Sequence, residues 1–172
     1  MSRVRTTILI PLAALILGGH APLPAQDPPI VVYLVRHAER GDDGTSDPPI
    51  TAAGRERALL LAAMLRDTGI THIHTTDYAR TRSTAAPVAE LTGLRPAVYD
   101  PRDLSGFAER LRRMPGRHFV VGHSDTTPAL VEALGGDPGA PIADPEYDRL
   151  YVLTLEGAGA STVLLRFGAP PP

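Results

Sequence analysis

The sequence predicts a three-layer α/β/α sandwich with a mainly parallel central sheet and a C-terminal antiparallel hairpin at its edge. A continuous apolar and β-branched run covers residues 30–35, which is typical of a strand buried on both faces. Short apolar runs then alternate with helix-like segments, the order that produces a parallel sheet. Near the C-terminus, two apolar runs, Leu150–Leu155 and Ser161–Phe167, flank a glycine-containing turn and predict the hairpin.

The elements between these two ends follow from local signals. Thr51 has the side chain of a helix N-cap and Gly69 is a natural stop, so we expect a helix from Thr51 to about Asp67. Its inner face is expected to carry Ala58, Leu61, Ala62 and Leu65. The later elements are expected as strands at 70–74, 97–99 and 118–121, and as helices at 78–91, 104–114 and 128–134.

Length and composition indicate one domain rather than several. The chain has 172 residues, 43% of them hydrophobic, and residues 26–172 are expected to form a single domain. A formal net charge of −2 gives no field that would collect nucleic acid or an anionic membrane. There is no cysteine, which excludes disulfides and a thiol nucleophile. All 17 basic residues are arginine, whose planar donors suit phosphate.

Residues 1–25 have the features of a secretory signal peptide. A basic start precedes the apolar stretch 8–17, and a Pro/Ala-containing segment leads to Ala25. We expect cleavage after Ala25, with cleavage after Ala21 as an alternative. Retention as an uncleaved anchor is the other alternative, although the apolar stretch is shorter than the roughly 20 residues of a spanning helix. The mature protein is therefore expected to be periplasmic or secreted, without a membrane attachment.

Polar segments follow three of the predicted parallel strands. Arg36 and His37 follow the first strand, residues 75–80 follow the second, and His123 follows the strand at 118–121. Because ligand sites in such sheets lie beyond the carboxyl ends of the strands, these segments are expected to converge on one edge.

The residues at this edge resemble a known family. The resemblance rests on four motifs in order, each at a predicted element boundary: Leu34-Val35-Arg36-His37-Ala38-Glu39, Thr51-Ala52-Ala53-Gly54, Tyr78-Ala79-Arg80-Thr81-Arg82-Ser83-Thr84-Ala85, and Val121-Gly122-His123-Ser124. Together they are similar to the histidine phosphatase superfamily, also called phosphoglycerate-mutase-like. The ordered match covers about Ile30 to Phe167, and the short length resembles the single-domain branch of that family.

The resemblance implies a catalytic role for four of these residues. His37 would be the nucleophile that becomes phosphorylated and is then dephosphorylated by water. Arg36 and Arg80 would hold the phosphate oxygens, and His123 would contact the phosphoryl group and support the charge of the transition state. Arg80 fits the family position better than Arg82, because a threonine follows it directly.

This chemistry agrees with the residue types. An imidazole nitrogen attacks phosphorus only when it is neutral, and nearby guanidinium charge disfavours imidazolium at His37. Arginines can stabilise charge on a transferring phosphoryl group where other enzymes use a metal, so neither a metal nor an organic cofactor is expected. His72 and His74 share one strand face and could bind a metal, but the sequence offers no evident third ligand.

Several acidic residues are candidates for the group that donates a proton to the leaving alcohol. Glu39 is the first choice, because it lies two residues beyond His37 and related short members with the same Arg-His-Ala-Glu run resemble this arrangement. Asp125 is the second choice, although an N-cap role would also explain it. The acidic residues Asp144, Glu146 and Asp148 could reach the site from their loop.

The sequence therefore predicts a phosphatase that hydrolyses phosphomonoesters through a phosphohistidine intermediate on His37. A mutase is disfavoured, because short loops leave little enclosure to exclude water. The alternatives are a protein phosphohistidine phosphatase and a catalytically silent protein that binds phosphorylated ligands. The expected partner is a small phosphorylated substrate, contacted by loops 40–49 and 136–148. The substrate's identity and the oligomeric state are left open by the sequence.

Overall fold

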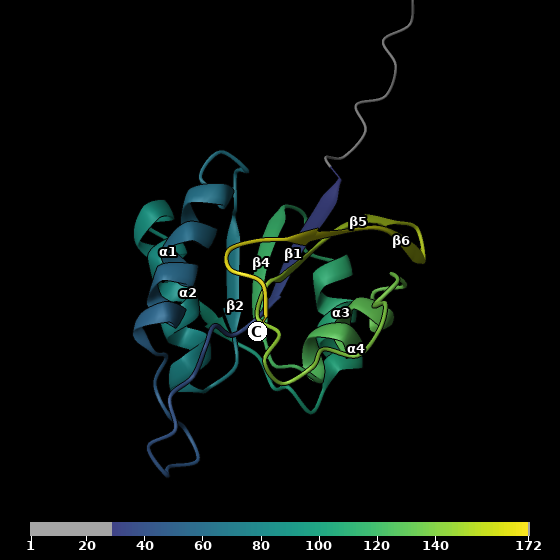
Figure 1. Ribbon diagram of the computed structural model, residues 1–172. Coiled ribbons are helices and arrows are strands. Elements are labelled where there is room, and N and C mark those ends of the chain that lie inside the picture. The colour runs from purple at the N-terminus through teal and green to yellow at the C-terminus, as the bar shows by residue number, and fades with distance from the viewer. Residues whose placement is uncertain (1–28, 172) are drawn as a thin grey trace, which may run out of the picture.

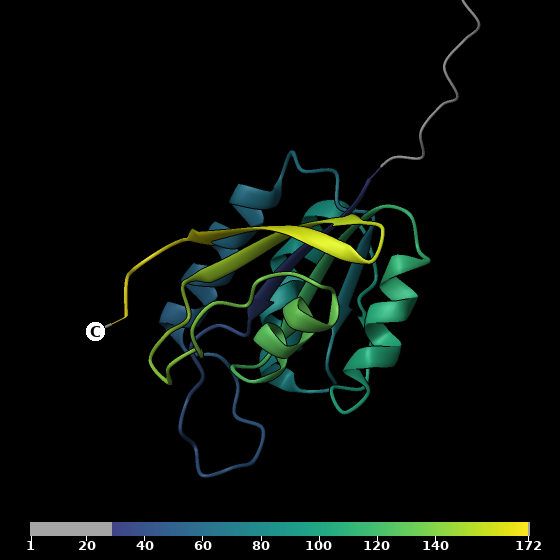
Figure 2. The same cartoon turned by 90° about the vertical axis from the view of Figure 1, so that its right-hand side faces the viewer.

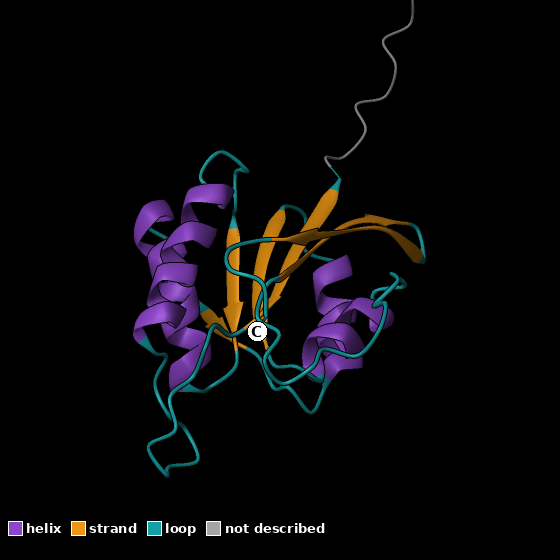
Figure 3. Cartoon of the chain, viewed as in Figure 1, coloured by secondary structure: helices purple, strands orange, loops and turns teal. Residues whose placement is uncertain are grey.

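The protein is seen in a computed structural model that describes residues 29–171. The predicted signal peptide at 1–25 lies outside the described residues. Helices cover both faces of a central sheet, so the predicted three-layer α/β/α sandwich is confirmed (Figures 1 and 3). None of the helices in the described part is both long and apolar enough to cross a membrane.

The sheet within residues 29–171 contains six strands in the order β3-β2-β4-β1-β5-β6. Their bounds are Ile30–Arg36 (β1), His72–Thr75 (β2), Ala97–Val98 (β3), Arg117–Gly122 (β4), Arg149–Glu156 (β5) and Gly159–Arg166 (β6). Strands β1 to β4 run parallel to one another, whereas β5 pairs antiparallel with both β1 and β6. The predicted hairpin thus forms the β6 edge of the sheet, as Figure 2 shows in yellow.

Two pairs of helices complete the layers. Helices α1 (Ala52–Leu65) and α2 (Ala79–Thr92) cover one face, and α3 (Leu104–Arg112) and α4 (Thr126–Ala133) cover the other (Figure 3). The continuous apolar run of β1 packs against the helices on both faces of the sheet. Leu34 packs in the cluster under α3 and α4, while Val35 packs in the cluster under α1 and α2. A central strand therefore needs apolar side chains at successive positions.

The predicted element types are confirmed, while some ends differ by one or two residues. Helix α4 begins at Thr126 rather than at Pro128, because Asp125 caps it by accepting a hydrogen bond from the Thr126 amide. Pro128 then lies in the first turn, where its missing N–H costs nothing. Helix α3 ends at Arg112, two residues before the predicted end at Met114.

The start of α1 presses against the segment that follows β1. The Thr51 side chain accepts from the Gly54 amide at 3.1 Å, and the Thr51 amide donates to the Glu39 carbonyl at 2.8 Å. A Cβ on Gly54 would lie only 2.5 Å from the Glu39 carbonyl oxygen. The motif Thr51-Ala52-Ala53-Gly54 therefore has a structural reason: it lets α1 approach the backbone beside His37 closely.

Candidate active site

The carboxyl ends of β1, β2 and β4 bring the predicted polar segments together. The His37 amide donates to the Gly122 carbonyl at 2.9 Å, which ties the residue after β1 to the end of β4. The His37 and His123 rings lie with their centroids 5.5 Å apart. The convergence predicted from the strand order is therefore present in the structure.

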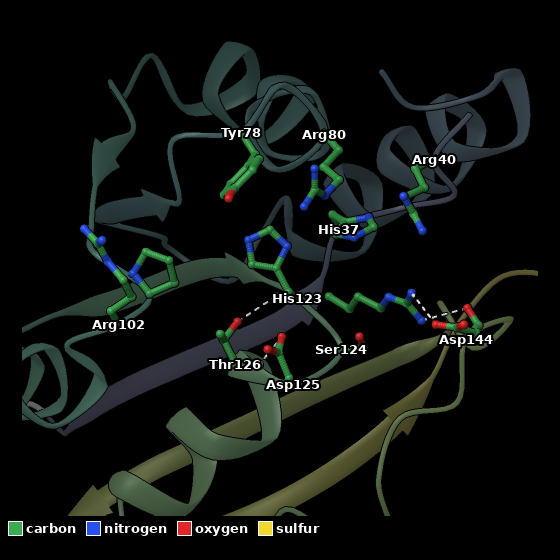
Figure 4. A pocket seen from close by; sticks show the side chains of 12 residues that line it. His37, Arg40, Tyr78, Arg80, Arg102, His123, Ser124, Asp125, Thr126 and Asp144 are labelled. Atoms are coloured by element: carbon green, nitrogen blue, oxygen red, sulfur yellow. Dashed lines mark hydrogen bonds and ion pairs between the residues drawn. The ribbon is translucent and has the colours of Figure 1, made fainter. Parts of the chain in front are cut away.

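A pocket of about 600 Å³ lies at this point, and we call it the His37 pocket (Figure 4). It contains both histidines and both arginines that the sequence singled out. Its lining residues are Arg36, His37, Arg40, Tyr78, Arg80, Pro101, Arg102, His123, Ser124, Asp125, Thr126 and Asp144.

The ring of His37 is held in one tautomer. Its Nδ1 lies 2.8 Å from the Ala38 carbonyl oxygen, and since a carbonyl can only accept, Nδ1 carries the proton. The neutral ring then leaves Nε2 with a free lone pair. Burial, with smaller contributions from the Arg36, His123 and Arg80 charges, lowers the pKa of His37 to about 3, against the raising effect of the Ala38 hydrogen bond. The ring is therefore neutral over the ordinary pH range.

The backbone beside His37 is fixed by α2. The Ala38 amide donates to the Thr84 hydroxyl at 2.9 Å, and that hydroxyl donates to the Arg80 carbonyl at 2.8 Å. Thr84 thus links the backbone next to His37 to α2, the helix that carries Arg80. From the sequence, Thr84 was recognisable only as a member of a motif.

Arg36 is held almost entirely by uncharged groups. Its Nη1 donates to the carbonyls of Ala143, Asp144 and Glu146 at 2.9–3.1 Å. Its guanidinium carbon lies 4.2 Å from the centre of the Tyr147 ring. The Nε of Arg36 is buried and has no hydrogen-bond partner within residues 29–171. An anion in the pocket would satisfy that donor.

Arg80 is held by different partners. Its Nη1 lies 3.3 Å from the Asp47 carboxylate, and its guanidinium carbon lies 4.3 Å from the centre of the Tyr78 ring. Its Nε is also buried, again with no hydrogen-bond partner in the described part of the chain. Both arginines line the pocket, and each has an Nε–H donor that is not used by another described residue. Such donors can bind the oxygens of a phosphate.

One nitrogen of His123 is occupied by a threonine pair. Its Nε2 lies 2.9 Å from the Thr76 hydroxyl, which in turn lies 3.0 Å from the Thr81 hydroxyl. This orients the ring and leaves Nδ1 for a ligand. Burial, with a smaller contribution from the charge of Arg80, lowers the pKa of His123 to about 4, against the raising effect of Asp125.

The structure does not bring Glu39, the first-choice proton donor, into the His37 pocket. Its carboxylate accepts from Arg57 Nε at 2.8 Å and Arg57 Nη2 at 2.7 Å. Arg57 is itself buried on α1 and also donates to the Phe167 carbonyl. The Glu39 carboxylate therefore pairs with the buried Arg57 guanidinium, whereas the next residue, Arg40, lines the His37 pocket.

The other candidate carboxylates divide into two groups. Asp125 and Asp144 line the His37 pocket, and the Asp144 side chain is 98% exposed and 3.9 Å from Arg36 Nη2. Glu146 and Asp148 are buried and bind Arg166, and Glu146 also binds Arg149. The Arg149 and Arg166 hydrogen bonds lower the pKa of Glu146 to about 2, against the effect of burial. Glu146 therefore stays ionised and is occupied in holding its own loop.

His72 and His74 do not belong to this site. They lie on β2 and stack with His118 of β4, with ring centroids 4.7 Å apart for His72 and His118 and 5.4 Å apart for His74 and His118. Among residues 29–171 no group of three or more histidines, cysteines or carboxylates is placed to hold a metal ion.

Three contacts to the arginines of the pocket were not predicted from the sequence. Asp47 reaches Arg80 from 33 residues away, and Tyr78 and Tyr147 each lie under one arginine. Tyr78 also meets the His123 ring edge-on at 5.1 Å, and Tyr147 lies 6.0 Å from the His37 ring. A tyrosine in a loop gives no sequence signal of such a role. Asp47 stands in an acidic loop whose fold the sequence does not specify.

The fold and the pocket define a small α/β protein with paired histidines and arginines at the carboxyl edge of its sheet. Residues 32–104 match the profile of the histidine phosphatase superfamily (branch 1), a range that includes His37 and Arg80. This match agrees with the family that the motifs resemble. His123 lies beyond the matched range and is placed beside His37 by the fold.

Sequence relatives match over part of the chain. A protein of Yersinia enterocolitica named "Probable phosphoglycerate mutase GpmB" is 47% identical over 77 residues, which are 41% of this chain and 35% of that protein. The protein of the same name from Serratia proteamaculans is 46% identical over 77 residues, with the same coverage. The match thus spans about a third of the length of these relatives.

Solved structures match over most of the described fold. The protein histidine phosphatase SixA, complexed with tungstate, has a TM-score of 0.66 at 19% identity, covering 79% of this chain and 96% of that one. The alpha-ribazole phosphatase of Shigella flexneri has a TM-score of 0.64 at 16% identity, covering 80% and 96%. At these identities the likeness concerns the fold.

Proposed function

We propose that this protein is a phosphatase that hydrolyses phosphomonoesters through a phosphohistidine intermediate on His37. The observation that carries the proposal is the hydrogen bond from His37 Nδ1 to the Ala38 carbonyl. It leaves Nε2 unprotonated in a pocket where two arginines keep unpaired Nε donors. Both observations support a nucleophile and an oxyanion site at the same place.

In the first step, the Nε2 lone pair of His37 attacks phosphorus. The P–N bond forms, the ester P–O bond breaks, and the leaving alkoxide takes up a proton. Arg36 and Arg80 would stabilise the equatorial oxygens, and His123 would add a donor from Nδ1 in the tautomer in which its Nε2 accepts from Thr76. The Ala38 carbonyl stabilises the phosphohistidine, because the ring must keep its Nδ1 proton while Nε2 bears the phosphoryl group.

In the second step, water attacks the phosphoryl group. The new P–O bond forms, the P–N bond breaks, and the electron pair returns to Nε2 of His37. The water loses its proton to the group that served the leaving alcohol, and inorganic phosphate leaves.

We propose Asp125 as the carboxyl group that exchanges these protons. It lines the pocket and follows His123 at the start of α4. Asp144 also lines the pocket, but it lies 3.9 Å from Arg36 Nη2, on the side of the arginine that is proposed to hold the phosphate. Glu39 is disfavoured by its ion pair with Arg57.

Hydrolysis is favoured over phosphoryl transfer to a second position on the substrate. Asp144 and Tyr78 are exposed at the pocket, so water reaches the intermediate. Arg40 and Arg102 line the pocket away from its centre, at the sides shown in Figure 4. They favour substrates that carry further negative charge beyond the transferred phosphoryl group.

A protein phosphohistidine is a second candidate substrate. The observation in its favour is the exposure of the pocket rim, which would admit a side chain presented by another protein. Comparing a phosphorylated histidine protein with small phosphomonoesters at equal concentration separates the two, since the favoured substrate has the higher kcat/KM.

Hydrolysis of an aryl phosphate by the purified protein tests the proposal. His37→Ala should lower kcat by about a thousandfold or more. His72→Ala, at the far end of the sheet, is the matched control and should keep the wild-type rate. Labelled substrate should leave an acid-labile phosphoryl group on wild-type protein. Full activity of His37→Ala would refute the nucleophile, and binding without turnover in every variant would favour the catalytically silent alternative.

We further propose that the protein acts outside the cytoplasm, from the sequence features of residues 1–25. Fractionation of expressing cells tests this, since an exported protein should be recovered from the periplasm or medium with its N-terminus at Gln26.

A further inference from the structure

Asp47, in the loop between β1 and α1, reaches across the site to the start of α2. Its Oδ1 and Oδ2 accept from the Ala79 amide at 3.0 and 2.9 Å, and Oδ1 also lies 3.3 Å from Arg80 Nη1. We infer that Asp47 is a positioning residue that sets the Arg80 guanidinium for phosphoryl binding. The inference rests on the proposed function, because Arg80 is taken to hold the transferred group.

Helix α2 needs such a group because it lacks a cap of its own. Tyr78 occupies the N-cap position and makes no side-chain capping bond, and the first turn has no acidic residue. The Asp47 carboxylate supplies the missing acceptor and places a negative charge at the helix N-terminus, where the backbone dipole favours it. One carboxylate therefore fixes both the start of α2 and the side chain that projects from it.

Asp47 and Tyr78 together restrict Arg80. The carboxylate binds one end of the guanidinium, while the Tyr78 ring lies against its plane at 4.3 Å. The Nε of Arg80 is left buried and without a partner among the described residues. An arginine held in this way does not have to give up rotamer freedom when the phosphoryl group arrives. Preorganisation of this kind lowers the barrier more than it tightens substrate binding.

The loop that carries Asp47 is anchored at its base. The Gly41 amide donates to the Pro49 carbonyl at 2.8 Å, and Arg40 and Ile50 form an isolated antiparallel bridge. From this base the loop projects below the body of the molecule in Figures 1 and 2. Pro48 is buried next to Asp47, so the carboxylate lies where the loop returns to the domain.

The two phosphate arginines are thus held in unlike ways. Arg36 is fixed by three backbone carbonyls, which no side-chain substitution removes directly. Arg80 depends on one side chain from a loop. Asp47 is therefore the place where the position of Arg80 can be changed without touching a residue that contacts the phosphoryl group.

The test compares Asp47→Asn with Asp43→Asn in the full protein. Asparagine keeps an acceptor for the Ala79 amide and removes the charge on Arg80, so kcat/KM for an aryl phosphate should fall about tenfold, mainly in kcat, with little change in Tm. Asp43 lies in the same loop and, among residues 29–171, forms side-chain hydrogen bonds only with Thr45, so its variant should match wild type. Asp47→Ser, which also keeps a capping group, provides a second variant if Asp47→Asn folds poorly.

A double-mutant cycle with Arg80→Ala separates a role through Arg80 from a general effect on the loop. In the Arg80→Ala background, Asp47→Asn should change kcat/KM by less than about twofold, because its target is gone. Wild-type kcat/KM in Asp47→Asn and Asp47→Ser, or an equal loss in both backgrounds, would overturn the inference.

If wild type hydrolyses nothing, the proposed function fails separately, and affinity for inorganic phosphate becomes the readout. Asp47→Asn should then bind phosphate more weakly than Asp43→Asn does. Equal affinity of these two variants would overturn the inference.

Discussion

The Nδ1 of His37 donates to the carbonyl of Ala38, the next residue, at 2.8 Å, and this contact decides which nitrogen can act. Because the pKa of His37 is lowered to about 3, the ring should stay in the Nδ1–H form between pH 5 and 8. Nitrogen-15 and proton spectra of the imidazoles test this. A protonation midpoint near 6.5 for His37 would contradict it.

Replacing Glu39 by Gln should affect stability more than catalysis. The substitution weakens the ion pair with Arg57, whose side chain is 8% exposed, and should cost about 1–3 kcal/mol of unfolding free energy. The rate on an aryl phosphate should stay within about twofold of wild type. Urea unfolding and steady-state kinetics on one preparation measure both. A large fall in kcat at unchanged stability would restore Glu39 as the proton donor.

Replacing Asp125 by Asn should make kcat depend more strongly on the pKa of the leaving group. Asparagine still caps α4, so the fold should persist. Alkyl phosphates should lose about 100-fold or more in kcat, whereas aryl phosphates with acidic leaving groups should lose much less. The measurement is kcat against leaving-group pKa for wild type and variant. Parallel plots for the two proteins would remove Asp125 from that role.

Tyr147 should act on Arg36 through the face of its ring. Tyr147→Leu should lower kcat/KM about fivefold, corresponding to about 1 kcal/mol of cation–π energy, while Tyr147→Phe should keep most of the activity. Both variants need equal Tm values for the comparison to hold. If Tyr147→Phe lost as much as Tyr147→Leu, the hydroxyl rather than the ring would be responsible.

The sequence predicted those parts of the fold that depend on local patterns. The apolar run of β1 and the Thr51 cap of α1 are read from neighbouring residues, and both are confirmed. The meeting of His37 with His123 was also predictable, because the carboxyl ends of parallel strands must share an edge.

The direction of individual side chains could not be predicted in the same way. Glu39 turns to Arg57, 18 residues further along, and Asp47 turns to Arg80, 33 residues further along. Both choices depend on where a buried or helical cation lies after folding. The residues next to Glu39 or Asp47 in the sequence do not specify where that cation lies, so only the structure gives the contacts of Glu39 with Arg57 and of Asp47 with Arg80.

Acid should destabilise the protein through the stacked histidines at the far end of the sheet. His118 Nε2 donates to the Met114 carbonyl at 2.9 Å, so its Nδ1 accepts from His74 Nε2 at 3.1 Å, and both rings are neutral. Burial, together with the neighbouring His118 charge, lowers the pKa of His74 to about 3, whereas an unfolded histidine titrates near 6.5. Between these values the unfolded chain binds more protons, so stability falls as the pH falls below about 6.5.

At pH 5 the loss from His74 alone should be about 2 kcal/mol relative to pH 7, since 1.5 pH units at about 1.4 kcal/mol each are involved. His74→Gln keeps a donor for His118 and removes the titration. Its unfolding free energy should therefore fall less steeply between pH 7 and pH 5, whatever its value at pH 7. Urea unfolding at both pH values measures the two slopes, and equal slopes for wild type and His74→Gln would show that His74 is already protonated in the folded protein at pH 5.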